Sequence, residues 1–363
     1  MKLRKEAIGW MFYDFANSAF TTVIVTVVFS VYFVQTIASG RPEGGEWLWS
    51  KAIAISMTMA AIFAPILGAM ADYSRSKKKF LIFFTILTII STAFLYFVGQ
   101  GDLIPAMILF IIANFSFNSA NVFYDSFLPE VGMKKDLGRI SGLGWGFGYI
   151  GGLVTLILAL RLIDKHIKLV WPMVSLHILI FSCITFLMLK EKQYPVPKKN
   201  YFKVAVDRVL FSLKHIKKMP DLLNFLISYF LYNIGIYTVI VYAAIFGGAQ
   251  FGMSQQSLII FFIIAQITSF IGAALFGLIA DKLNVRLALS ISLIIWIAVV
   301  IWAFFCNTAQ EYYYLGLLAG LAIGSSQANS RTMLSVLTPL DKQAEFFGFY
   351  TLVGRISSII GPF

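Results

Sequence analysis

Long apolar runs separated by short polar segments cover almost the whole chain. A helix needs about 20 apolar residues to cross the hydrocarbon of a bilayer, so each run of that length predicts one membrane span. Glycine, proline and clusters of charge mark the ends of the runs. The pattern predicts an all-α membrane protein with eleven spans, at 9–37, 50–71, 80–98, 104–128, 140–162, 170–189, 222–247, 255–280, 287–306, 312–337 and 346–363.

Composition agrees with a protein that lives in a lipid bilayer. Apolar residues make up 59% of the chain and charged residues 13%, and the mean hydropathy is +0.82. Soluble domains average about 45–50% apolar and about 25% charged residues. These values exclude a water-soluble fold and make the lipid bilayer a predicted partner.

The 29 Lys and Arg residues, against 17 Asp and Glu, are distributed unevenly between alternate loops. Most lie on the side of the N terminus. Cytoplasmic loops retain positive charge, so the N terminus is predicted to be cytoplasmic. The net charge of +12 is therefore a topology signal, and no nucleic-acid partner is predicted. The few basic residues on the other side are Arg41, Lys51, Arg161, Lys165 and Lys168.

A long polar stretch divides six spans from five and predicts the domain organisation. Residues 1–189 are predicted to form an N-terminal six-helix bundle, and 222–363 a C-terminal bundle. The segment 190–221 is predicted to be a cytoplasmic linker. Within it, Tyr201–Met219 is basic and partly amphipathic, which is typical of a helix on the inner membrane surface.

The two halves of the chain share a weak internal repeat. The segment Gly68–Asp72 matches Gly277–Asp281 at an offset of 209. Glycines after the fourth and tenth spans match at an offset of 210, for example Gly138 with Gly348. Because six spans separate the halves, the repeats are predicted to be parallel, related by an axis along the membrane normal.

Several motifs resemble a known superfamily and one of its branches. The Gly-x3-Asp motif of Gly68 and Asp72, the basic cluster that follows it and a glycine-rich fifth span resemble the major facilitator superfamily. More specific motifs resemble the vacuole-effluxer-like family, which has bacterial members and includes the fungal autophagy-related vacuolar amino-acid effluxer. These motifs are Tyr13–Phe20, Gly142–Trp145, Tyr232–Asn233, Gln327–Arg331 and Glu345–Tyr350.

The resemblance implies two parallel six-helix repeats that work by alternating access. It implies export or exchange of small polar solutes, with amino acids and protons as candidates, by a monomer in the bacterial inner (plasma) membrane. No cofactor is implied. Of the twelve spans implied, this sequence is expected to lack the last, because it stops at Phe363 inside the eleventh.

Polar and ionisable side chains inside spans are costly, so each is a candidate site residue. In the first span, Asp14 and Asn17 fall on a polar stripe at helical spacing. The fourth span places three asparagines and an aspartate on one face, which predicts a water-filled pathway. The alternative is interhelical hydrogen bonding that stabilises the bundle. The residues on this face are Asn114, Asn118, Asn121 and Asp125.

The second half supplies tyrosines, amides and one arginine. Arg331 lies within the tenth span, where a buried guanidinium requires an anion: Asp14, Asp125, Glu345 or a substrate carboxylate. All these stripes are predicted to converge on one central cavity. The remaining predicted substrate-binding residues are Tyr232, Asn233 and Tyr237 of the seventh span and Gln327 of the tenth. Asn329 lies on the tenth span, between Gln327 and Arg331.

A second group of charged residues is predicted to form the inner gate. The superfamily resemblance implies that Asp72 approaches the start of the eleventh helix, near Glu345 to Gly348, where the helix dipole favours a carboxylate. The predicted gating residues are Asp72, Arg75, Asp281, Glu345 and Arg355.

Other function classes are weakly supported by the sequence. The two cysteines and three histidines form no disulfide, metal or haem pattern, so no metal or cofactor is predicted. No nucleophile has a neighbouring base within the spans, so the protein is predicted not to be an enzyme. A cation-coupled sugar or peptide symporter would share the fold. A non-transporting membrane scaffold is the alternative of another class, and it would not need a polar interior.

Overall fold

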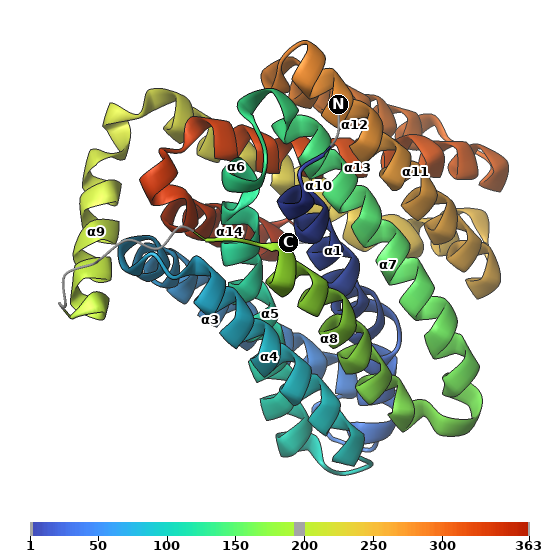
Figure 1. Ribbon diagram of the computed structural model, residues 1–363. Coiled ribbons are helices and arrows are strands. Elements are labelled where there is room, and N and C mark those ends of the chain that lie inside the picture. The colour runs from blue at the N-terminus through green and yellow to red at the C-terminus, as the bar shows by residue number, and fades with distance from the viewer. Residues whose placement is uncertain (1–2, 192–199, 362–363) are drawn as a thin grey trace. The chain divides into compact units, whose positions relative to one another are not determined.

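A computed structural model describes residues 3–191 and 200–361, and the regular structure of these residues is helical, with no strand. The predicted all-α fold is confirmed. Each predicted span corresponds to a long helical segment whose ends fall within a few residues of the prediction (Figure 1). The segments are Lys5–Ile37, which begins with α1 (Lys5–Ala19), α3 (Gly45–Ser74), α4 (Lys77–Phe94), α5 (Leu103–Ser126), α7 (Leu137–His166), α8 (Val170–Met188), α10 (Pro220–Phe251), α11 (Gln255–Lys282), α12 (Val285–Phe305), α13 (Ala309–Leu337) and α14 (Gln343–Ile360).

Two shorter helices lie between these segments. They are α6 (Leu128–Val131) and α9 (Tyr201–His215), and α9 lies within the segment predicted as a linker helix. Residues 192–199 of the predicted linker lie outside the described residues. By length and hydropathy alone, eight helical stretches of the described part qualify as membrane spans, and one of them, Lys134–Met188, contains both α7 and α8. The helices α13 and α14 fall below this threshold because they carry more polar residues.

The first span departs from regular α-helical geometry. The N–H of Val28 donates to the carbonyl of Val23 at 2.9 Å, and that of Ala38 donates to Phe33 at 2.8 Å, five residues back in each case. These bonds define wide π-helical turns over Phe20–Val27 and Phe33–Ile37. Wide turns of this kind are rare and often lie near functional sites. The apolar pattern did not predict them, because a π turn and an α turn bury similar side chains.

The described chain divides into two compact units that do not follow the order of the sequence. Of the described residues, the first contains 3–127, 150–191, 200–211 and 341–352, and the second contains 128–149, 212–340 and 353–361. The helices α7 and α14 therefore contribute one part to each unit. The domain boundaries at 189 and 221, which were inferred from the spans and the repeat, stay a prediction.

Within the first unit, α1 packs on α8, α4 packs on α5 and α8, and α3 packs on α5 (Figure 1). One end of this unit has an aromatic core in which Trp171 meets Phe29 edge to face, with ring centroids 5.0 Å apart. On α4, Phe83, Ile86 and Ile90 are exposed at helical spacing. An exposed apolar stripe of this kind is typical of a helix that faces lipid.

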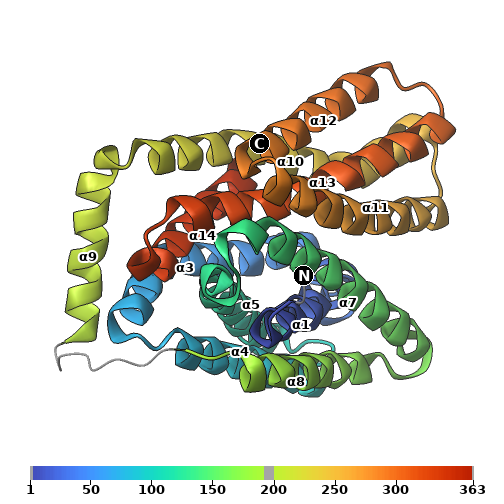
Figure 2. The ribbon, with the colours of Figure 1, turned by 45° about the horizontal axis from the view of Figure 1, so that its top comes forward.

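Within the second unit, α13 lies between α11 and α12, and Figure 2 shows the three helices side by side. Glycines allow α11 and α13 to approach closely. A Cβ atom at Gly272 would collide with the carbonyl of Leu321, and one at Gly324 would collide with that of Ser269. Small residues at helix contacts are the usual means of tight packing in membranes, where no hydrophobic force joins the helices.

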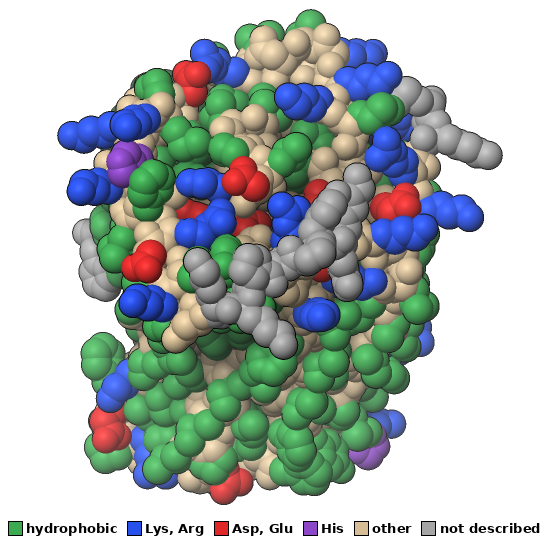
Figure 3. Space-filling view, turned by 60° about the vertical axis from the view of Figure 1, so that its left-hand side comes forward, with side chains coloured by type: hydrophobic (Ala, Val, Ile, Leu, Met, Phe, Trp, Pro, Cys, Tyr) green, Lys and Arg blue, Asp and Glu red, His purple; other side chains and the backbone are tan. Residues whose placement is uncertain are grey.

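On one face of the molecule, most basic side chains gather apart from a large apolar area. Figure 3 looks at the molecule from the left-hand side of Figure 1. Lys and Arg side chains gather in the upper part of this view, and hydrophobic side chains cover most of the lower part. An apolar area of this kind is typical of a surface that contacts lipid.

The register of the repeat in α7 and α14 differs from the prediction. Gly142 lies against the carbonyl of Ala273 in α11, and Gly348 lies against that of Ala64 in α3. Ala64 and Ala273 are equivalent at the offset of 209, so Gly142 and Gly348 are equivalent too, 206 positions apart. The predicted offset of 210 is wrong by about one helical turn. The error arose because Gly138 and Gly142 are one turn apart, and each can be matched to Gly348.

Candidate functional site

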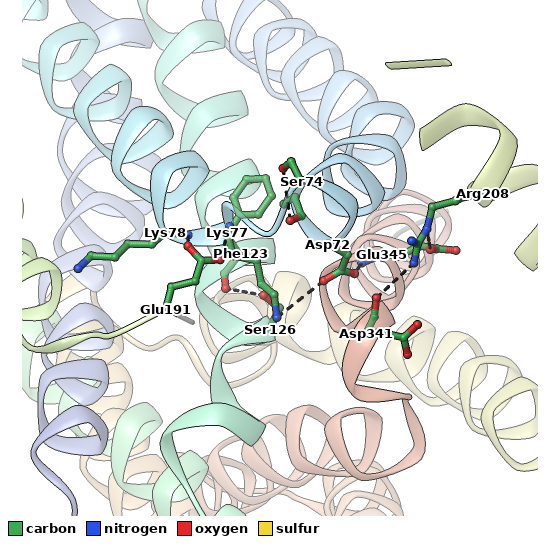
Figure 4. Close-up of polar contacts among 11 residues, drawn as sticks. Asp72, Ser74, Lys77, Lys78, Phe123, Ser126, Glu191, Arg208, Asp341 and Glu345 are labelled. Atoms are coloured by element: carbon green, nitrogen blue, oxygen red, sulfur yellow. Dashed lines mark hydrogen bonds and ion pairs between the residues drawn. The ribbon is translucent and has the colours of Figure 1, made fainter. Parts of the chain in front are cut away.

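Two carboxylates cap the N-termini of helices from the opposite half of the sequence. Asp72, near the end of α3, accepts a hydrogen bond from the backbone N–H of Glu345 in the first turn of α14, at 2.8 Å (Figure 4). Asp281, near the end of α11, accepts from the N–H groups of Gly138 and Arg139 in the first turn of α7, at 2.7 and 2.8 Å. Helix N-termini favour negative charge. The predicted approach of Asp72 to Glu345 is confirmed, while the gating role of both carboxylates stays a prediction.

The two contacts are equivalent under the repeat. Asp72 and Asp281 are related by the offset of 209, as are Gly68 and Gly277. Gly68 lies against the carbonyl of Ala344, and Gly277 lies against that of Gly138. In each case a glycine lets the two helix backbones come into contact, and the carboxylate one turn later on the same helix caps the N-terminus of the other helix.

Replacement of Gly68 by valine is expected to separate α14 from α3, because the new Cβ would collide with the carbonyl oxygen of Ala344. The collision involves backbone atoms, so a rotamer change cannot relieve it. Overpacking of this kind costs about 1–3 kcal/mol, which should lower the melting temperature of the purified protein. Gly235→Val is the matched control, since no atom lies within 4 Å of a Cβ at Gly235. An equal fall in melting temperature in the two variants would contradict the close-packing role of Gly68.

A cluster of charges surrounds the Asp72 contact within the first unit (Figure 4). Lys77 Nζ lies 3.7 Å from Asp72 Oδ1, and both side chains are buried. Glu345 is fully buried, and its Oε2 lies 3.5 Å from Nε of Arg208 in α9. Arg208 also donates to the carbonyl of Asp341 at 3.2 Å. The linker helix α9 thus holds the start of α14, a contact that the sequence did not predict.

Glu191 is a further functional candidate that the sequence analysis missed. Its carboxylate accepts from the N–H groups of Lys77 and Lys78, at 2.7 and 3.1 Å, and so caps the N-terminus of α4 (Figure 4). Lys78 Nζ donates to the carbonyl of Leu189 at 2.7 Å. The signal was present, because an acidic residue closely follows the sixth span, but its partner is more than a hundred residues away.

The asparagine stripe of α5 makes many of its hydrogen bonds inside the first unit. Asn114 donates to Ser56 Oγ of α3 at 2.7 Å, and Asn118 donates to the backbone carbonyl of Asn114 at 2.6 Å. Asn17 of the first span donates to Asn121 Oδ1 at 2.8 Å. The bonds to Ser56 and from Asn17 join different helices, as in the alternative considered for this stripe, whereas the bond from Asn118 to Asn114 lies within α5. The stripe's role in substrate binding stays a prediction.

The two aspartates of the predicted site lie in the same unit. Asp14 is 7% exposed on α1, and Asp125 is half-buried near the end of α5. The neighbouring helices are joined by Trp10, whose indole N–H donates to the carbonyl of Tyr124 at 2.8 Å. Both aspartates therefore lie in helices whose positions are fixed by buried contacts.

Arg331 of α13 is 2% exposed and contacts α7 within the second unit. Its Nε donates to Ser141 Oγ at 2.9 Å, and its Nη2 donates to the Ser141 carbonyl at 2.7 Å. Ser141 Oγ in turn donates to the carbonyl of Ala328 at 2.8 Å. The guanidinium carbon lies 5.4 Å from the ring centroid of Trp145. Two hydrogen bonds and the face of an aromatic ring thus position the guanidinium. The pairing of Arg331 with a carboxylate stays a prediction.

The other predicted residues of the second unit differ in burial. The hydroxyls of Tyr232 and Ser330 lie 2.6 Å apart and join α10 to α13. Asn233 is 1% exposed, whereas Tyr237 and Gln327 are half-buried. Asn329, one residue before Ser330, is fully buried.

The remaining gating candidates lie at the ends of helices or inside α14. Arg75 is exposed and adopts a left-handed conformation, with φ of 49°, where α3 ends. Arg355 is half-buried on α14. Their roles stay predictions. Over residues 3–191 and 200–361, no three His, Cys, Asp or Glu side chains gather in a way that could hold a metal ion.

This fold, with equivalent carboxylate contacts in its two repeats, defines a membrane transporter of the major facilitator superfamily. Among solved structures, the human organic anion transporter MFSD10 superposes with a TM-score of 0.79 at 12% identity, covering 99% of this chain and 92% of that one. The chain belongs to the family described as vacuole effluxer Atg22 like, whose sequence model matches residues 49–137 and 132–363.

Two relatives illustrate the breadth of the family. An uncharacterised major-facilitator-type transporter of Bacillus subtilis, YxiO, is 29% identical over 99% of this chain and 87% of its own length. Autophagy-related protein 22 of Kluyveromyces lactis is 24% identical over 99% of this chain and 86% of its own length. The resemblance on which the sequence analysis relied is therefore confirmed.

Proposed function

We propose that this protein is a secondary active transporter that moves small polar solutes across the membrane by alternating access, with amino acids as its solutes and efflux as its direction. The family description, vacuole effluxer, supports the class of activity. In this proposal the N terminus is cytoplasmic, the protein acts as a monomer in a bacterial plasma membrane, and it has no catalytic activity. Protons are the proposed coupling ion.

The observation that carries this proposal is the equivalence of the Asp72 and Asp281 contacts. Each links the end of one helix to the start of a helix from the other half of the sequence, through a carboxylate and backbone N–H groups. The charge distribution predicts that both lie at the cytoplasmic end. Two matched contacts of this kind are suited to closing the cytoplasmic end of the transporter. Both would break together when that end opens.

The energies involved are compatible with a reversible gate. A carboxylate at a helix N-terminus contributes about 0.3–1 kcal/mol when exposed and up to about 2 kcal/mol when partly buried. Two such contacts together amount to the coupling energies of about 1–3 kcal/mol that are typical of switching proteins. A solute that binds the two states with different affinity can therefore shift the equilibrium between them.

Counterflow in proteoliposomes tests the proposal. Vesicles that contain the purified protein are loaded with one unlabelled L-amino acid, and uptake of the same labelled amino acid is followed. A carrier is expected to show transient accumulation, which a scaffold or an enzyme cannot produce. Each standard L-amino acid is tested in turn, with D-xylose and a dipeptide as controls for the symporter alternative. Absence of counterflow with every solute, in vesicles shown to contain folded protein, would contradict the proposed function.

A further inference from the structure

The helix α9 carries apolar side chains that the rest of the described chain leaves exposed. Phe202, Leu210 and Leu213 are each more than half exposed. In a helix with 3.6 residues per turn, these three side chains fall within about 80° of one another. The exposed Lys203 and Lys214 lie beside this apolar face. A helix with an apolar face bordered by lysines is typical of one that lies in the interface of a bilayer.

The opposite side of α9 packs against the region where α3 meets α14. Tyr201 meets Tyr73, at the end of α3, edge to face with ring centroids 5.9 Å apart. Ala205 is fully buried. Arg208 Nε lies 3.5 Å from Glu345 Oε2 in the first turn of α14 (Figure 4). One side of α9 therefore touches the contact between α3 and α14, and the other side is apolar and basic.

Glu345 receives a counter-charge from α9. Its carboxylate is fully buried, whereas the Arg208 side chain is 27% exposed. A buried carboxylate that loses its ion-pair partner is strongly destabilising. The backbone N–H of Glu345 is also the group that donates to Asp72. Movement of α9 away from α14 would therefore disturb the residue on which the Asp72 contact depends.

The charges of the segment indicate which surface α9 would meet. Residues 200–219 include five Lys or Arg and one acidic residue, Asp207. Basic clusters of this size beside a membrane attract anionic phospholipids. The apolar face favours a lipid surface over a soluble anion, which would leave that face in water. Arg208 is turned to Glu345, and four exposed lysines remain for the lipid: Lys203, Lys214, Lys217 and Lys218.

We propose that α9 binds anionic phospholipids in the leaflet on the predicted cytoplasmic side, and that this binding keeps the contact between α3 and α14 closed. The apolar face enters the headgroup region and the lysines meet the lipid phosphates. Arg208, on the other side of the helix, is thereby held against Glu345. The lipid composition of the membrane then biases the equilibrium between closed and open contacts. This inference goes beyond the proposed function, because it requires no particular solute.

A spin label on α9 tests the contact with lipid. The full chain, without its native cysteines, carries the label at Leu213→Cys on the apolar face. It is placed in nanodiscs of phosphatidylcholine alone or with phosphatidylglycerol as a third of the lipid. Phosphatidylglycerol is expected to raise the ratio of oxygen to nickel-chelate collisions at this label at least about twofold, since the apolar face enters the bilayer. A label at Asp207→Cys, on the polar side of the same helix, is the matched control and should stay accessible to the nickel chelate.

Removal of the lysines separates charge from apolar contact. The triple variant Lys203→Gln, Lys214→Gln and Lys217→Gln is expected to lose the response of the label at position 213 to phosphatidylglycerol, because each lysine contributes about fivefold to binding at an anionic surface. The control variant Lys134→Gln with Lys135→Gln removes exposed lysines of another polar segment and should keep the response.

The link to the contact between α3 and α14 is tested by cysteine modification. Phe346 on α14 is 1% exposed, so a cysteine at this position is shielded while the contact is closed. Modification of Phe346→Cys by a maleimide is expected to be about fivefold slower in the discs that contain phosphatidylglycerol. Arg208→Gln with Glu345→Gln removes both members of the ion pair. This double variant should abolish the effect of lipid on the modification rate and keep the response of the label on α9.

Three results would overturn the inference. The label at position 213 could stay equally accessible to nickel in both kinds of disc, which would show that α9 does not bind anionic lipid. The triple lysine variant could respond like wild type, which would show that the lysines do not recognise the lipid. The cysteine at position 346 could react equally fast in both discs, which would show that the lipid does not hold the contact. Transport is not measured in any of these experiments, so their failure would leave the proposed function standing, and a lack of counterflow would leave this inference standing.

Discussion

Replacement of Asp72 by asparagine is expected to open the contact between α3 and α14. Asparagine keeps the shape but loses the charge that the N-terminus of α14 and the ammonium of Lys77 both favour. Hydrogen bonds to charged groups contribute about 1.5–3 kcal/mol, so the population of the open contact should rise on the order of tenfold to a hundredfold.

The rate at which a buried cysteine is modified reports this opening. Phe346 follows Glu345 on α14 and is 1% exposed, so a cysteine at this position is shielded while the contact is closed. In a background that carries Phe346→Cys and lacks the native cysteines, Asp72→Asn should speed modification by a membrane-impermeant maleimide. Asp102→Asn is the control, because Asp102 accepts a hydrogen bond from the N–H of Gly99 in an exposed loop away from this contact. An unchanged rate with Asp72→Asn would show that the carboxylate does not hold the gate.

Arg331→Lys is expected to lower stability and transport nearly as much as complete removal of the side chain would. The guanidinium binds both the hydroxyl and the carbonyl of Ser141 through two different nitrogens. A lysine has a single nitrogen at the end of a flexible chain and cannot reproduce this fork or its stacking on Trp145. The lost bonds should reduce the free energy of unfolding by about 1.5–3 kcal/mol and transport by at least about tenfold.

Thermal unfolding and counterflow of the purified variant measure these losses. The matched control is Arg286→Lys, because Arg286 forms an ion pair with Asp221 at 3.6 Å in which both side chains are more than two-thirds exposed. Exposed pairs contribute only about 0–1 kcal/mol, so this variant should resemble wild type. If Arg331→Lys and Arg286→Lys melted at the same temperature, the buried contact with Ser141 would carry no special stability.

The helices could be predicted from the sequence because hydrophobicity is a local property. The span predicted at 287–306 is α12 (Val285–Phe305), and the span predicted at 104–128 is α5 (Leu103–Ser126). The wide turns over Phe20–Val27 could not be predicted, because they change the backbone hydrogen bonds without changing the apolar pattern. The repeat register of α7 and α14 was wrong because several glycines recur near one-turn intervals.

The contacts of the site could be predicted only in part. The bond between Asp72 and the start of α14 was expected from the superfamily resemblance and agrees with the charge preference of helix ends. The ion pair of Arg208 with Glu345 could not, because Arg208 is one of many basic residues in the linker and its partner is distant in sequence. Spacing showed that Asn114 and Asn118 share a face, but it could not show that Ser56 lies opposite.

The central claim is that the contact between α3 and α14 must open once in every transport cycle. A reversible disulfide across it is the most direct test. One cysteine is placed within 64–72 and the other within 343–348, and a pair is chosen that oxidation cross-links completely, which requires Cα atoms about 4.4–6.8 Å apart. Counterflow of the cross-linked protein is expected to stop and to return when the disulfide is reduced. Counterflow that continues at the full rate in the cross-linked protein would contradict alternating access through this gate.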